Sequence, residues 1–141
     1  MSIWKTAPDL SSINEASRET LVGHLGIEFV EAGDDYIKAT MPVDQRTHQP
    51  MGILHGGASL ALAETLGSVG SLLCIEDLSK NHCVGLEINA NHVRSVHEGQ
   101  VTGIAKPIHL GKTTHVWEIR IVSDDERPVC ISRMTLAVID H

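Results

Sequence analysis

The chain has 141 residues, of which 42% are hydrophobic and 21% charged, as in ordinary globular proteins, so we expect one domain over residues 1–141. A formal charge of −7 at pH 7 argues against a general nucleic-acid or anionic-membrane binder. Three cysteines without CxxC spacing, and a start (MSIWKTAPDL) without the apolar stretch of a signal peptide, predict a cytoplasmic protein with free thiols.

The first part of the chain predicts short helices and a β-hairpin. One or two short helices are expected in the first twenty residues, with Ser11, Ser12 and Asn14 as candidate caps. The stretches HLGIEFVEAG and DDYIKATMPV then predict two strands that turn at Gly33-Asp34, with every second residue of the latter apolar. An irregular segment, DQRTHQPMGILH, follows. Because aromatic residues are few, we expect an aliphatic core.

The apolar run from Gly56 to Ile75 is 20 residues long, which is enough to cross a membrane. It contains Glu64, however, and is rich in Gly, Ser, Thr and Ala. We therefore predict a helix that is buried on all sides inside a protein core, and no membrane association.

After a polar loop, Glu76 to Asn81, the pattern is strand after strand. Alternating residues predict strands over 113–123 and 128–139, and two more are expected in CVGLEINANHVRSV and GQVTGIAKPIHLGK. Strands and helices do not alternate, which argues against a doubly wound parallel sheet. The predicted fold is α+β, with one antiparallel sheet wrapped around one long buried helix.

Glu64 is the first candidate catalytic residue. A carboxylate in an apolar site is costly unless it is protonated or used, and a dry site would suit it as a general base or nucleophile. Ser68 lies one turn further along the same helical face, where it could hold Glu64 or a water molecule. The structural alternatives are a helix charge that reaches solvent or an arginine, and a small residue that allows close helix packing.

Gly56 and Gly57 stand where the long helix begins. Free backbone N–H groups and a positive dipole end suit a carbonyl oxygen that becomes an oxyanion, although Gly-Gly can also serve only as a tight entry turn. Eight residues of helix place Gly56 and Glu64 about 12 Å apart, too far to act on one carbonyl. Two helices packed antiparallel across a two-fold axis would bring them together, which predicts at least a dimer with two equivalent sites.

With these residues in place, the sequence resembles the hotdog-fold acyl-CoA thioesterases over nearly its whole length. The resemblance lies in HQPMGILHGGASLALAETLGS, VGLEINANHVRS and PIHLGK. Within the family, the likeness is greatest to the bacterial 1,4-dihydroxy-2-naphthoyl-CoA hydrolases of menaquinone synthesis. The proofreading thioesterases of aryl-capped siderophore synthesis are similar but less alike in sequence, and a general acyl-CoA or acyl-carrier-protein thioesterase is a further alternative.

The resemblance implies a role for each matching residue. Glu64 would be the catalytic carboxylate, assisted by Ser68, and both would come from the partner subunit. The Gly56 amide, with His55, would polarise the thioester carbonyl, while Gln49 would contact the acyl or thioester group. The CoA portion would be held by Gly85, His92, Val93, Arg94, Ser95, His109, Leu110, Gly111, Lys112, Thr113 and Thr114. The family also implies a homotetramer made of two dimers.

From the residues alone, His55 and Gln49 could equally serve as a helix cap and in loop packing. Arg94 and Lys112 belong to a local basic excess that suits phosphate groups, whereas Lys106 and Arg120 could be exposed strand charges. Nine histidines without an HExxH motif or clustered spacing predict no metal, and no cofactor is expected. A hotdog dehydratase and a non-catalytic acyl-CoA sensor are the remaining functional alternatives.

Overall fold

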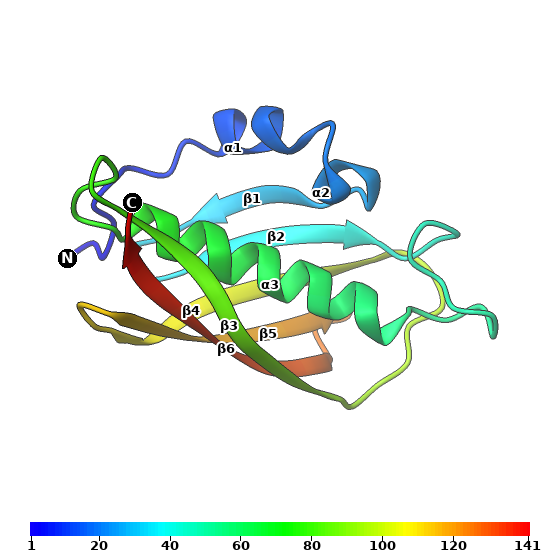
Figure 1. The fold of residues 1–141 in the computed structure, drawn as a ribbon. Coiled ribbons are helices and arrows are strands. Elements are labelled where there is room, and N and C mark those ends of the chain that lie inside the picture. The colour runs from blue at the N-terminus through cyan, green and yellow to red at the C-terminus, as the bar shows by residue number, and fades with distance from the viewer.

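The computed structural model describes residues 1–141 as three helices and six strands (Figure 1). Two short helices come first, then two strands, then one long helix and four strands, so helices and strands do not alternate one by one. The elements are α1 (Leu10–Ser17), α2 (Leu21–His24), β1 (Glu28–Ala32), β2 (Ile37–Pro42), α3 (Gly56–Leu73), β3 (Asn81–His92), β4 (Gln100–Leu110), β5 (Thr114–Ser123) and β6 (Pro128–Asp140).

All six strands form one antiparallel sheet in the order β1-β2-β4-β5-β6-β3. The long helix α3 lies across one face of this sheet, and the short helices α1 and α2 lie beside its β1 side (Figure 1). This arrangement confirms the predicted α+β fold with one antiparallel sheet around one long helix. The edge strand β3 is twelve residues long and pairs only with β6.

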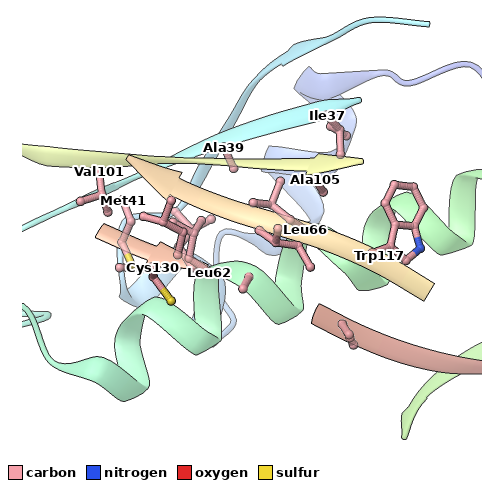
Figure 2. Packing of buried hydrophobic residues seen from close by; sticks show 14 of the residues in the cluster. Ile37, Ala39, Met41, Leu62, Leu66, Val101, Ala105, Trp117 and Cys130 are labelled. Carbon is pink, nitrogen blue, oxygen red and sulfur yellow. The ribbon is translucent and has the colours of Figure 1, made fainter. Parts of the chain in front are cut away.

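The core lies between α3 and the inner face of the sheet. Leu62 and Leu66 of α3 point towards the strands and are fully buried (Figure 2). They pack against alternate residues of the strands, and burying such aliphatic side chains is a major source of stability. Phe29 and Trp117 are also buried, so the expectation of a purely aliphatic core is wrong.

The expectation that α3 is buried on all sides is wrong for the single protomer. Leu62, Ala63 and Leu66 face the sheet and are buried, whereas Gly57, Glu64 and Leu72 are exposed. The physical reason is that one sheet offers one layer of packing, so only one face of the helix is covered. None of the three helices combines the length and apolarity that crossing a bilayer requires.

The N-terminal helices form as expected, but the cap of α1 is Asp9 instead of one of the predicted residues. The Asp9 carboxylate accepts a hydrogen bond from the Ser12 backbone N–H, 3.2 Å away. Asn14 has a different role: its side chain donates to the Phe29 carbonyl and accepts from the Phe29 N–H. Asn14 therefore ties α1 to the edge of β1.

The hairpin and the later strands match the predicted stretches, although their ends differ by a few residues: β3 begins at Asn81, which was expected in the preceding loop, and β6 runs one residue further, to Asp140. Ile37, Ala39 and Met41 are completely buried, as the alternation predicted. β3 stops at His92, earlier than expected, and residues 93–99 form a loop that ends at Gly99 with a φ of 84°. The three cysteines are free.

Candidate active site

His55 caps the N-terminus of α3. Its Nδ1 accepts a hydrogen bond from the Gly57 N–H at 2.7 Å. A neutral imidazole whose Nδ1 accepts must carry its proton on Nε2. The cap therefore leaves the exposed His55 ring with an N–H donor: Nδ1 caps the helix, and Nε2–H is free to donate to a ligand.

Gly56 presents a backbone N–H at the start of the helix. No protein group accepts a hydrogen bond from it, as is normal for the first turn of a helix. The ring of His92, at the end of β3, lies against this residue, with Nε2 3.0 Å from where a Cβ would stand. A side chain here would push against His92, so glycine keeps both the amide and the ring accessible.

Gly56 lines a hollow of about 450 Å³ that also takes in Gln49 and the whole segment His92–Ser95. The Gln49 side-chain oxygen accepts from the Met51 N–H, so the amide NH₂ is the free end. The loop of Gln49 and the loop after β3 are joined by a 2.8 Å hydrogen bond from the Leu54 N–H to the Val96 carbonyl. Ser59, which sequence reasoning missed, also lines this hollow.

Glu64 and Ser68 line a different hollow, on the other side of α3, with a volume of about 570 Å³. No residue lines both hollows. The Glu64 carboxylate is exposed in the protomer, and no hydrogen bond or ion pair holds it. Gly85, at a β-bulge in β3, lies beside it: a Cβ there would stand 3.5 Å from Glu64 Oε2.

Apart from Gly85, which lies beside Glu64, the predicted CoA-binding residues fall into two groups that lie far apart on one protomer. His92–Ser95 lies with the N-terminal end of α3, whereas the turn His109–Thr114 joins β4 to β5 at the opposite end of the sheet (Figure 1). Lys112 and Gly111 line a hollow there with Cys74, which follows the C-terminal end of α3. One chain therefore does not bring the whole predicted set together.

Two of the basic side chains in this set are unpaired within the chain. Arg94 and Lys112 take part in no ion pair, whereas Arg120 lies 3.3 Å from the Glu118 carboxylate. An unpaired cation on an exposed surface is available for a phosphate group. Groups of three or more His, Cys, Asp or Glu side chains that could hold a metal ion do not occur in the structure.

A buried polar cluster, which sequence reasoning also missed, lies between α3 and β5. The Trp117 indole N–H donates to Ser71 Oγ at 2.7 Å, and Ser71 Oγ lies 2.9 Å from His115 Nδ1. Burial lowers the pKa of His115, and the nearby His109 lowers it further. This cluster anchors the sheet to the helix, and it lies away from both hollows that contain the candidate catalytic residues.

Comparison with known proteins places this arrangement in a family. Residues 51–130, which run from just before α3 into β6, match the model of the thioesterase superfamily. The chain belongs to that superfamily; it has the hotdog fold and is a hydrolase, as the resemblance implied.

Three relatives cover almost the entire chain. The 1,4-dihydroxy-2-naphthoyl-CoA hydrolase of Escherichia coli is 52% identical over 137 residues, which cover 97% of this chain and 99% of the relative. The proofreading thioesterase EntH of Cronobacter turicensis is 53% identical over 137 residues, covering 96% and 98%. A mutant thioesterase from Pseudomonas aeruginosa has a crystal structure that superposes with a TM-score of 0.97 at 51% identity, covering 99% and 100%.

Proposed function

We propose that this protein hydrolyses an aryl- or acyl-CoA thioester at two equivalent sites formed between the protomers of a homodimer. The observation that carries the proposal is the separation of the site within one chain. Gly56, His55 and Gln49 lie at the start of α3, while Glu64 and Ser68 lie about two and three turns further along and line another hollow. The Gly56 N–H and the Glu64 carboxylate must both reach the same thioester carbonyl, so they must come from different copies of the chain.

The free edge of β3 supports this assembly. β3 ends the sheet and exposes apolar side chains, among them Leu86 at 61% of its surface. A long, uncovered edge strand favours pairing with another strand, and two-fold pairing of β3 with its copy is antiparallel. The two α3 helices would then also run antiparallel, with Glu64 of one protomer covered by the other.

The chemistry follows from these positions. The Gly56 N–H of one protomer, with the Nε2–H of His55, would bind the thioester carbonyl oxygen and stabilise the negative charge that develops on it. Glu64 of the other protomer either takes a proton from water as the water oxygen attacks, or attacks the carbonyl carbon itself. The carbon–sulfur bond then breaks and CoA leaves as a thiolate that takes up a proton. The two routes differ by an enzyme-bound anhydride, which heavy-oxygen water would reveal by labelling the Glu64 carboxylate first.

The same two-fold arrangement would complete the CoA site. Gly85 lies beside Glu64, and the turn with Lys112 lies at the far end of the sheet, so both would face the partner's N-terminal helix end with Arg94. Lys112 and Arg94 from different protomers would then bind phosphate groups of one CoA molecule. We extend the proposal to a dimer of dimers and to a cytoplasmic location, which the free Cys74, Cys83 and Cys130 favour.

The acyl group we propose is 1,4-dihydroxy-2-naphthoyl, the group named in the E. coli relative. EntH, at a similar identity, has a proofreading role in its name, so the acyl group must be tested directly. A panel of dihydroxynaphthoyl-, benzoyl- and fatty acyl-CoA, with kcat/KM measured for each, decides between them. A preference for fatty acyl-CoA by more than tenfold would contradict the naphthoyl assignment.

Mixed dimers test the two-chain site. Glu64→Gln and His55→Ala are each expected to be inactive as homodimers. When the two are unfolded together and refolded as a mixture, each mixed dimer would carry one site with both changes and one intact site. Activity should therefore return to about a quarter of that of the wild-type protein.

If the site lay within a single chain, the mixture would stay inactive, because every protomer carries either Glu64→Gln or His55→Ala. Continued inactivity of the mixture would overturn the two-chain proposal, provided that light scattering shows dimers. Glu64→Gln mixed with Glu64→Ala is the matched control, and it should stay inactive in either case.

A further inference from the structure

The hollow that Glu64 lines has a wall that the catalytic proposal does not use. Helix α2 and the residue after it contribute Leu21, Val22 and Leu25, which lie opposite α3. The volume of about 570 Å³ falls within the usual range for small-molecule sites, roughly 300–1,000 Å³. α2 therefore helps to enclose a space large enough for a sizeable chemical group.

The lining of this hollow is mostly apolar, and its polar members besides Glu64 are the hydroxyl residues Ser17, Thr65 and Ser68. Leu60 and Val69 of α3 and Ile88 of β3 line the space together with the α2 residues, and Glu64 is its only charged member. The Glu64 carboxylate would repel a phosphate group there, and the apolar walls would not replace the water around a nucleotide. An apolar acyl group that displaces water from these walls would gain binding free energy.

From this we infer that the hollow receives the acyl group of the substrate, and that the side chains of α2 select acyl groups by size. The inference rests on the proposed function, because Glu64 at the rim marks the position of the thioester carbonyl. The acyl group then extends from Glu64 along the exposed face of α3 until it reaches α2. The substrate class is an apolar acyl group of aryl size or larger.

The position of α2 depends on close packing of the backbone. A Cβ on Gly23 would stand only 2.0 Å from the Arg18 carbonyl oxygen, so glycine is required where α2 approaches the end of α1. Gly26, with a φ of 74°, then turns the chain into Ile27, which is buried beside β1. The chain is thus constrained at both ends of α2, while Leu21, which lines the hollow, keeps 64% of its surface exposed.

Two substitutions in the wall test the inference. Val22→Phe narrows the hollow, and Leu21→Ala removes an apolar contact at its rim. The measurement is the ratio of kcat/KM for a naphthoyl-CoA to kcat/KM for benzoyl-CoA. We expect Val22→Phe to lower this ratio about tenfold or more, and Leu21→Ala to lower it about threefold.

Leu78→Ala is the matched control for Leu21→Ala, because Leu78 is an exposed leucine, at 42%, outside both hollows. It should leave the ratio unchanged. Leu21→Ala removes little packing, so it keeps the test valid if Val22→Phe fails to fold, which circular dichroism would show.

The outcomes separate this inference from the function on which it rests. An unchanged ratio in folded Leu21→Ala and Val22→Phe, with activity still dependent on Glu64, overturns the role of α2 and leaves the catalytic proposal standing. An equal decrease for both substrates also overturns it, since α2 would then act only on the site as a whole. Absence of thioester hydrolysis by the wild-type protein overturns both.

Discussion

Glu64 Oε2 lies 3.5 Å from the position that a Cβ on Gly85 would occupy. Gly85 stands at the β-bulge between its pairing with Leu136 and that of Glu87 with Thr135. The absent side chain leaves the carboxylate room to lie against β3 at this bulge. The position of the proposed catalytic group therefore depends on a residue of another element, 21 positions away in the chain.

Gly85→Val should lower kcat by about ten- to hundredfold, because its methyl groups would displace the Glu64 carboxylate. Gly85→Ala should be much milder: its Cβ would meet Glu64 at an ordinary contact distance and Met134 Cε, the end of a flexible side chain, at 3.1 Å. Steady-state kinetics and a thermal melt of both variants check this. Equal activity of the valine and alanine variants would show that the carboxylate is not positioned by this contact.

Glu64→Gln should abolish most of the hydrolysis, with a loss in kcat of at least a hundredfold. Its effect on stability should be small, about 0.5 kcal/mol at most if the dimer persists, because the carboxylate has no partner within the chain. Glu87→Gln is a matched control, since Glu87 lines a smaller hollow with Glu64 but accepts hydrogen bonds from Asn89. Comparable losses in both variants would refute the assignment of Glu64 alone.

The two functions of His55 can be separated. Asparagine is among the best N-caps, so His55→Asn should keep the Gly57 hydrogen bond and the stability of α3. His55→Ala should cost about 1 kcal/mol of unfolding free energy. Both variants lose the Nε2–H donor, and for each we expect kcat/KM to fall about a hundredfold. Urea unfolding and kinetics on the same samples are the measurement, and an active asparagine variant would show that His55 only caps the helix.

The stability of the protein should decrease in mild acid because of His115. Burial holds the pKa of this ring below its ordinary value of 6.5. As the pH falls through 6.5, the unfolded chain takes up a proton that the folded ring does not, so the neutral ring stabilises the fold fully only above that pH. Urea unfolding at pH 7.5 and pH 5 should show this loss, and His115→Gln should reduce the difference. An undiminished difference in the variant would assign it to other groups.

The three thiols, two buried and that of Cys83 half-buried, should react slowly in the folded protein. Burial raises the pKa of Cys74 to about 11, and burial also raises the pKa values of Cys83 and Cys130. At pH 8 only about one Cys74 thiol in a thousand would then be the reactive thiolate. A thiol-specific reagent should label these cysteines slowly until guanidinium is added. Rapid labelling of all three without denaturant would contradict this prediction.

Local patterns in the sequence were enough to predict most of the elements. The alternation of Ile37, Ala39 and Met41 marked a strand with one buried face, and the apolar run after His55-Gly56 marked the long helix. These patterns are readable because the periods of helix and strand are properties of neighbouring residues. Asp9 was missed as a cap because three other polar residues nearby could equally serve.

What the amino-acid sequence determined by itself is the helix start at Gly56, the eight-residue spacing to Glu64 and the alternating strands, because each depends only on local geometry. The tertiary structure decided that His92 lies against Gly56, that Glu64 lies beside Gly85 and is exposed, and that α2 faces α3 across a hollow. These contacts join residues far apart in the chain, and they form only when the sheet has closed on one face of the helix. No local period carries that information, since the same patterns fit a helix covered on one face or on all sides.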